Sequence, residues 1–133
     1  MKTVENYVSE ETAVALNKAC VFIKPLEFDC DKILPDLWWY QRDGVLTLEK
    51  ESDCEDFDFA YQAPTLTECI VWFAERGITI ITDHCGLDNE WHTVTCFGKD
   101  PKKWVSRRGN TSYIEAMNAA IRDAAKAYAE NNN

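Results

Sequence analysis

Several features that assign a protein to a class are scarce or missing in this sequence. Its 133 residues include only five glycines and four prolines, and no glycine-rich, phosphate-binding loop is among them. No run of apolar residues approaches the ~18 that a membrane span needs. Residues 1–11 carry three glutamates in place of the basic segment that opens a secretory signal. We therefore expect a cytoplasmic protein with no membrane segment.

The composition fits one globular domain. With 46% hydrophobic, 12% aromatic and 28% charged residues, the chain lies in the ordinary range, which excludes a collagen-like repeat, a coiled coil and extended disorder. A domain of this size buries roughly two-thirds of the surface that its unfolded chain exposes, so its core can hold it without metal or disulfide bonds. We expect a single compact domain over residues 1–133.

Six cysteines lie scattered through apolar segments, at positions 20, 30, 54, 69, 85 and 96. Without a secretory signal, their even number is weak evidence for a disulfide framework. A reduced cysteine packs as a small apolar side chain. We expect reduced cysteines, most of them buried, with Cys69 packed beside Leu66 and Phe73.

The net charge of −9 is unevenly distributed along the chain. Residues 1–98 hold 19 of the 23 acidic residues and 7 of the 14 basic ones, whereas residues 99–133 hold 4 acidic and 7 basic residues. Because an acidic surface repels nucleic acid, we expect no nonspecific nucleic-acid binding. A phosphate-bearing ligand would have to use the basic segment near the C-terminus.

Three helices are predicted from capping residues and apolar spacing. The first spans about residues 10–20. The second begins with a capping box formed by Thr65 and Glu68, and it ends at Gly77, which supplies a left-handed residue. The third follows Ser112 and runs for about four turns, with one apolar stripe.

Two hairpins are predicted between and after these helices. Asp43-Gly44 joins residues 37–42 to residues 45–50, and this dipeptide favours a two-residue turn that places Trp39 opposite Leu48 on the core face. Strand-like residues 78–84 and 91–97 form the second hairpin.

The predicted order of elements is αββαββα. Neither hairpin needs a parallel crossover, and each helix has one apolar stripe to bury. The fold class that satisfies both conditions is α+β: an antiparallel sheet of two hairpins with helices packed on it.

Short packing motifs also resemble a known group of proteins. They are Tyr7-Val-Ser-Glu-Glu-Thr-Ala, Ala63-Pro64-Thr65 before a helix with Trp72, Ile78-Thr-Ile, and Ser112-Tyr-Ile-Glu-Ala with Ala120-Ile121. The chain resembles small uncharacterised proteins of gut Bacteroidales phages and prophages. The resemblance implies a shared fold and a viral or mobile-element origin, and it implies no catalytic residue.

Four residues of metal-ligand type lie in the second hairpin: His84, Cys85, His92 and Cys96. Strand alternation puts His84 and Cys85 on opposite faces, so at most three of the four converge. No glycine-framed nucleophile motif surrounds either cysteine, and no calcium-loop pattern is present. We expect two surface histidines and two packed cysteines, with no metal, no cofactor and no enzymatic activity.

Two features are candidates for binding another protein. Residues 49–58 hold six acidic residues in ten positions, including Glu51, Asp53, Glu55, Asp56 and Asp58. Trp38 and Tyr40 lie opposite the core face of the first hairpin, where they form a contact patch unless a helix covers them. The leading hypothesis is a nonenzymatic phage accessory protein. Its acidic, aromatic-containing surface would bind, and by that means inhibit, a host or defence protein. A small homo-oligomer is compatible with it.

The basic segment 99–108 supports an alternative. It contains Lys102, Lys103, Trp104, Arg107 and Arg108. Cations with an aromatic ring between them can hold a phosphate and stack on a base, so the alternative function is a small-ligand-binding protein for a nucleotide or a signalling molecule. The competing interpretation is a solvated loop whose charge balances the acidic run, with Trp104 packed on the core.

Overall fold

The computed structural model describes residues 7–19, 37–42, 45–50 and 59–131, with the side chains of β1, β2 and β3 described only at Trp39. The elements are α1 (Glu10–Lys18), β1 (Leu37–Arg42), β2 (Val45–Lys50), β3 (Phe59–Gln62), α2 (Leu66–Ala74), β4 (Thr79–Cys85), β5 (Glu90–Cys96), the 3-10 helix η3 (Pro101–Lys103), β6 (Val105–Asn110) and α3 (Tyr113–Asn131). The protein is therefore α+β, as its sequence predicts.

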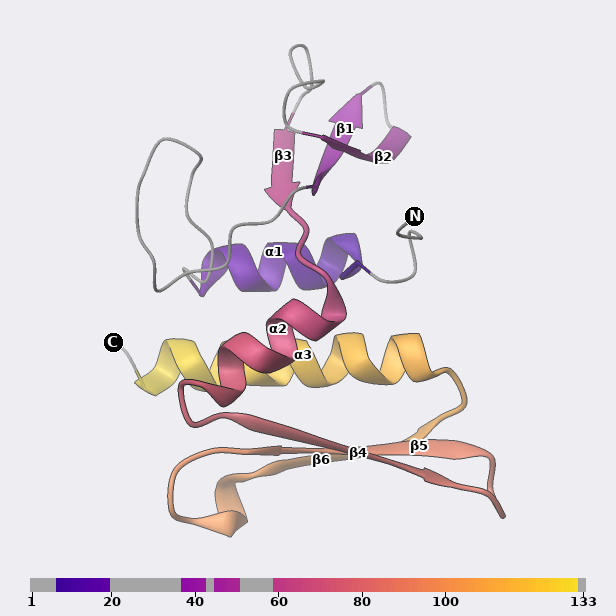
Figure 1. The fold of residues 1–133 in the computed structure, drawn as a ribbon, viewed down its shortest axis with the longest axis vertical. Coiled ribbons are helices and arrows are strands. Elements are labelled where there is room, and N and C mark those ends of the chain that lie inside the picture. The colour runs from indigo at the N-terminus through magenta and orange to yellow at the C-terminus, as the bar shows by residue number, and fades with distance from the viewer. Residues whose placement is uncertain (1–6, 20–36, 43–44, 51–58, 132–133) are drawn as a thin grey trace.

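The strands form two separate antiparallel sheets of three strands each, in the orders β2-β1-β3 and β4-β5-β6. They lie at opposite ends of the longest axis of the molecule, with the helices between them (Figure 1). The prediction of one sheet built from both hairpins is therefore wrong. The reason is that α3 contacts the second sheet on one side and α1 on the other, which keeps the hairpins apart.

Each sheet also has a third strand that the sequence patterns did not predict. β3 has four residues, too few to show an alternating pattern, and it pairs with β1. β6 contains Arg107, Arg108 and Gly109, which are typical of a solvated loop, and it pairs with β5. Pairing with a neighbouring strand, more than local preference, makes these segments strands. Among the described residues, the order of α-helices and strands is thus αβββαβββα and not αββαββα.

Local predictions that rest on turn and cap chemistry are confirmed. β1 pairs with β2 in the predicted register, with Trp39 opposite Leu48. The Thr65 hydroxyl accepts a hydrogen bond from the Glu68 backbone N–H at 3.1 Å, and the Glu68 carboxylate accepts one from the Thr65 N–H at 2.9 Å. Gly77 follows α2 with a φ of 81°, the left-handed conformation that favours glycine.

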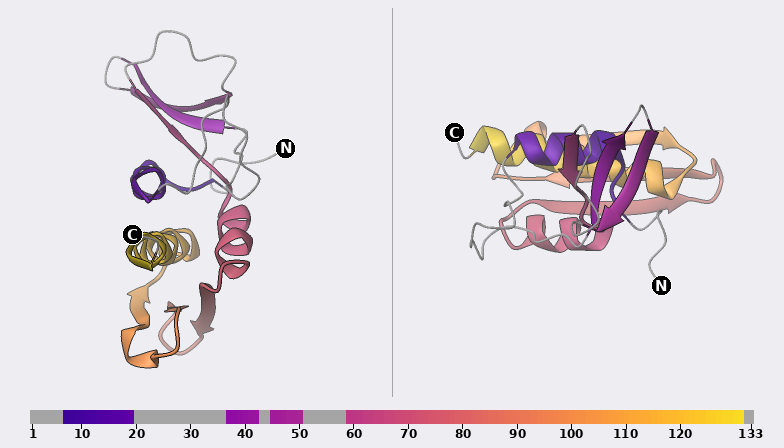
Figure 2. Two further views of the ribbon diagram at one scale, coloured as in Figure 1. Left: turned by 90° about the vertical axis from the view of Figure 1, so that its left-hand side faces the viewer. Right: turned by 90° about the horizontal axis from the view of Figure 1, so that it is seen from above.

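Helix α3 is at the centre of the packing. Figure 2 shows α1 stacked on α3, with α2 beside them. Alanines dominate the buried side chains of α3, which are Ala116, Met117, Asn118, Ala119, Ala120, Ile121, Ala124, Ala125 and Ala127. Small side chains allow neighbouring elements to approach closely. The first sheet joins this core through Trp39, whose indole N–H donates to the Val8 carbonyl at 2.7 Å, as the assignment of Trp39 to the core face predicts.

The second sheet has one covered face and one open face. Towards α3, the Thr82 hydroxyl lies 3.0 Å from the Met117 sulfur and the Thr95 hydroxyl donates to the Ala120 carbonyl at 3.4 Å. Because side chains alternate along a strand, the neighbouring positions lie on the opposite face. No helix in the described ranges covers that opposite face (Figure 1). We call it the open face; it comprises Thr79, Ile81, Asp83 and Cys85 of β4, Glu90, His92, Val94 and Cys96 of β5, and Ser106 of β6.

One buried polar side chain links α1 to α3, and it provides a test of this packing. The Asn118 carboxamide oxygen accepts a hydrogen bond from the Ser9 N–H at 2.8 Å. We expect Asn118→Ala to lower the free energy of unfolding by about 1–3 kcal/mol, because it leaves the Ser9 N–H without its acceptor. The control Asn17→Ala changes an exposed residue of α1, so its effect should stay within about 0.5 kcal/mol. Urea denaturation followed by circular dichroism measures both, and equal stability of the two variants would contradict the assigned link.

Candidate functional site

For the predicted protein-binding residues, the side chains lie outside the part of the chain that the structure describes. Glu51, Asp53, Glu55, Asp56 and Asp58 lie outside the described residues. Trp38 and Tyr40 belong to β1, where their backbones pair with Glu49 and Thr47, but their side chains are also outside the description. The role of these seven residues stays a prediction.

The basic segment 99–108 is not the single loop that the sequence predicts. Lys102 and Lys103 lie in η3, where the Asp100 carboxylate caps the Lys102 N–H at 3.1 Å. Arg107 and Arg108 lie in β6. The prediction fails because strand pairing with β5 overrides the preference of a charged segment for solvent.

Trp104 separates the two halves of this segment and is half-buried. Its indole N–H donates to the Phe97 carbonyl at 2.8 Å. This hydrogen bond ties the Trp104 ring to the segment that follows β5, and the packing of Trp104 on the core stays a prediction.

Arg107 is held by an acidic residue of α3. The Asp123 carboxylate accepts two hydrogen bonds from the guanidinium, from Nε and, at 2.7 Å, from an Nη atom. The hydrogen bond to Asp123 raises the pKa of Arg107 above its ordinary value, against an opposing effect of burial. Only 10% of the Asp123 side chain is exposed, so the pair balances a charge that solvent reaches poorly.

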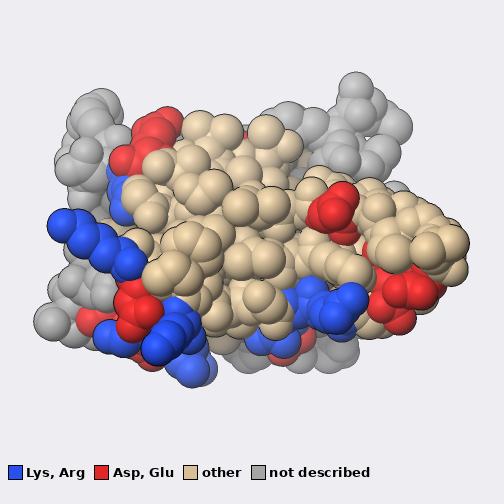
Figure 3. Space-filling view, turned by 90° about the horizontal axis from the view of Figure 1, so that it is seen from below, with Lys and Arg blue, Asp and Glu red and all other residues tan. Residues whose placement is uncertain are grey.

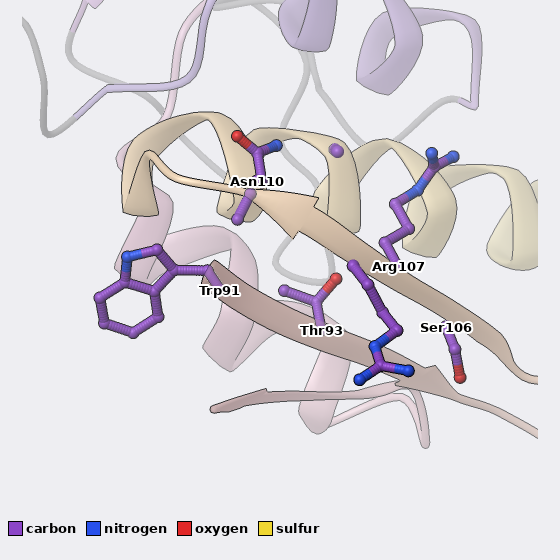
Figure 4. Close-up of a pocket in the computed structure, with 8 residues that line it drawn as sticks. Trp91, Thr93, Ser106, Arg107 and Asn110 are labelled. Carbon is purple, nitrogen blue, oxygen red and sulfur yellow. The ribbon is translucent and has the colours of Figure 1, made fainter. Parts of the chain in front are cut away.

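A pocket of about 280 Å³ lies where β5 and β6 meet α3. Figure 4 shows Trp91 and Arg107 at its two ends, with Thr93 between them. The β5–β6 pairing shifts register between Trp91 and Thr93, so the strands separate locally at this point. The lining residues are Trp91, Thr93, Ser106, Arg107, Arg108, Asn110, Ala116 and Ala119. Of the predicted ligand-binding set, the pocket thus includes Arg107 and Arg108 but not Lys102, Lys103 or Trp104.

The predicted metal-type residues of the second hairpin do not converge as a set. His84 packs on Trp91 with ring centroids 4.6 Å apart, on the face that continues towards α3. Cys85 and Cys96 share the open face but lie at its two ends, opposite Glu90 and Thr79. Strand alternation therefore separates His84 from Cys85, and the length of the strand separates Cys85 from Cys96.

Cys69 is fully buried in the core with Leu66 and Phe73, as predicted from helical spacing. Burial, and secondarily the charge of Glu68, raises the pKa of the Cys69 thiol far above its usual range. Cys69 is thus a protonated core side chain and not a nucleophile. It is a free thiol, as are Cys85 and Cys96, which are partly exposed.

The open face itself is a feature that sequence patterns did not single out. Figure 3 shows this end of the molecule, where uncharged side chains cover most of the surface, charged ones gather towards the two ends, and an acidic side chain also lies among the uncharged ones. Ile81 is 52% exposed on this face, and Leu87 at the tip of the β4–β5 hairpin is 98% exposed. Alternation along residues 78–84 indicates two faces. It does not reveal which of them the helices leave uncovered.

Comparison with protein-family models, with curated proteins and with solved structures finds no match to this chain. Within the described ranges, no helix combines the length and the apolar character that crossing a bilayer requires. The exposed surfaces and the pocket described above are therefore the basis for proposing a function.

The Arg107–Asp123 pair makes a prediction that separates two adjacent arginines. We expect Arg107→Gln to lower the free energy of unfolding by about 1 kcal/mol, because Asp123 loses both of its donors, with the loss shrinking as salt rises. Arg108→Gln should change it by less than about 0.5 kcal/mol, since no ion pair in the described structure involves Arg108. Urea denaturation at low and high salt measures both variants. Identical curves for the two would show that the pair contributes nothing.

Proposed function

We propose that this protein is a nonenzymatic binding protein and that the open face of the β4-β5-β6 sheet is its main contact with a partner protein. The observation that carries the proposal is the exposure of Ile81, 52%, in the middle of the edge strand β4, on a sheet face that no described helix covers. Ile81 lies directly opposite Val94, so the two side chains form an apolar cross-strand pair.

An exposed Ile81 beside a partly exposed Val94 favours association with another protein. Scattered surface hydrophobics are common, but an apolar centre with a polar rim is characteristic of interfaces with other proteins. Leu87 extends the apolar surface beyond the sheet at the hairpin tip, where it is almost fully exposed. A buried aliphatic anchor in a partner's pocket stabilises a complex strongly.

The charge of the chain specifies the chemistry of the partner. Residues 79–96 contain three acidic residues and no lysine or arginine, and the whole chain has a net charge of −9. The complementary surface is an apolar patch bordered by lysines or arginines. The resemblance to phage proteins makes a host or defence protein of the bacterial cytoplasm the proposed partner, with inhibition as the consequence of occupying its surface.

The acidic run has a separate role in this proposal. Its flanking strands, β2 and β3, belong to the sheet at the opposite end of the molecule from the open face (Figure 1). Charge acts over a Debye length and speeds the approach of a basic partner without forming the contact itself. Trp38 and Tyr40, in that same distant sheet, are the alternative contact site.

A pair of variants with matched exposure tests the open face. Ile81 on β4 and Val71 on α2 are 52% and 51% exposed. After capture and identification of the partner from host lysate, we expect Ile81→Glu to weaken binding to the purified partner by about tenfold or more, because it puts a charge in the interface centre. Val71→Glu should leave the affinity within about threefold. Calorimetry or surface plasmon resonance measures both.

Three outcomes would overturn this assignment. Equal affinity of the Ile81 and Val71 variants would place the contact elsewhere. If neutralising Glu51, Asp53, Glu55, Asp56 and Asp58 abolished binding at all salt concentrations, and not only slowed association at low salt, the acidic run would be the contact. If Ile81→Glu dissociated an oligomer of the protein alone in sedimentation experiments, the open face would be a self-interface.

One observation favours a second candidate function, the binding of a small phosphate-bearing ligand. The pocket beside α3 is lined by both Arg108 and Trp91. Its volume of about 280 Å³ is near the lower end of the range of small-molecule sites, roughly 300–1,000 Å³, so it fits a compact group and not a whole nucleotide. Because Asp123 already neutralises Arg107, Arg108 is the cation left for the ligand.

Thermal denaturation with a panel of nucleotides and inorganic phosphate tests this second function. Binding to the folded state raises the melting temperature. We expect Arg108→Gln to abolish such a rise, and the double change Lys102→Gln and Lys103→Gln to preserve it, because those lysines lie outside the pocket. Loss of the rise in the lysine variant alone would instead assign the ligand to η3, and no rise in the unaltered protein would exclude this function for the compounds tested.

A further inference from the structure

The β4–β5 hairpin brings together three side chains whose chemistry the sequence patterns did not connect. Ligand atoms of Asp88, Glu90 and His92 all lie within 4.8 Å of one another. Glu90 and His92 are two residues apart in β5 and project from the open face. Asp88 precedes them in the turn, and its exposed side chain is free to rotate.

The imidazole of His92 points independently to a ligand. Its Nε2 atom is buried and has no hydrogen-bond partner, and it is the only such side-chain atom in the described part of the protein. The nearest acidic atom, Glu90 Oε2, lies 3.9 Å away, too far for a hydrogen bond. Buried polar groups of proteins are paired in the great majority of cases, so an unpaired ring nitrogen beside two carboxylates requires an explanation.

The cross-strand neighbours of these residues are also potential ligands. Asp83 lies opposite His92, and Cys85, a free thiol, lies opposite Glu90. Residues directly opposite each other in antiparallel strands point to the same face, with Cβ atoms ~4.5–5.5 Å apart. No lysine or arginine occurs between residues 79 and 96, so this hairpin contains no cation of its own.

From this arrangement we propose that Asp88, Glu90 and His92 bind a divalent transition-metal ion of the zinc type, with the Cys85 thiolate or a water molecule as the fourth ligand. Zinc bonds of ~2.0–2.2 Å place two ligand atoms of a tetrahedral ion roughly 3.3–3.6 Å apart. Small rotations of the three side chains would bring their ligand atoms from the present spacing, within 4.8 Å, to that separation. An imidazole nitrogen selects zinc-type ions over Mg²⁺ and Ca²⁺, which favour all-oxygen sites. The ion would satisfy His92 Nε2 and tie the hairpin turn to β5.

This inference does not depend on the proposed partner, because the purified chain alone tests it. The chain, without an affinity tag and kept reduced, is stripped with a chelator and titrated with Zn²⁺ by calorimetry and with Co²⁺ by absorption spectroscopy. We expect about one ion per chain and a rise in melting temperature that chelator reverses. A thiolate-to-cobalt charge-transfer band that Cys85→Ser removes would assign Cys85 as the fourth ligand, and its absence would assign water.

Matched variants of the same hairpin identify the ligands. His92→Ala and Asp88→Asn should each weaken Zn²⁺ binding, the former by about 100-fold. His84→Ala, which changes the same residue type at a non-ligand position of β4, should leave the affinity for Zn²⁺ within about threefold. Asp88 is exposed, so its variant tests the site even if loss of His92 disturbs folding.

The proposal is wrong if the stripped protein binds no Zn²⁺ or Co²⁺ under these conditions. It is equally wrong if His84→Ala and His92→Ala reduce affinity alike, since general thiol or surface binding would then account for the titration. Retention of full affinity by Asp88→Asn would remove Asp88 from the site and leave too few ligands for the proposed ion.

Discussion

Helix α3 is buried on two sides, and the positions of both sheets follow from its contacts. A helix with a single apolar stripe packs against other elements on one side only. By contrast, α3 contacts α1 and α2 as well as the β4-β5-β6 sheet. A helix in such a position needs small side chains, and alanines supply most of its buried surface. Asn118 contributes a long-range polar link from this helix to the N-cap of α1, through the Ser9 N–H.

This use of α3 determines which surfaces remain for function. The helix occupies the inner face of the second sheet, where Thr82 and Thr95 make hydrogen bonds with it. Since α1 packs on the other side of α3 and α2 lies beside both, no described helix is left to cover the outer face. The exposed Ile81 and the unpaired nitrogen of His92 both lie on that face because of the same packing arrangement.

The roles of the charged residues also depend on the face of the sheet on which they lie. Arg107 reaches the covered side of the sheet and pairs with Asp123, so it contributes to the fold. Arg108, its neighbour in β6, forms no ion pair in the described structure and lines the pocket. The segment that forms the β4–β5 hairpin contains no lysine or arginine. Its acidic residues can therefore bind a basic partner surface or a cation. Identical residue types in one segment thus differ in role according to the face on which strand pairing places them.

Elements with local signals are predictable from the sequence. Asp43-Gly44 with its flanking strands, the Thr65–Glu68 capping box and the left-handed Gly77 each involve contacts within a few residues, and the structure contains the corresponding elements. Tertiary structure alone decided what depends on distant partners: β3 and β6 as strands, the division into two sheets, the pairing of Arg107 with Asp123 and the uncovered side of the second sheet. Period-two alternation states that a strand has two faces, but it does not identify the covered one. That choice is made by α3, whose contacts span the length of the chain, and no local pattern encodes such contacts.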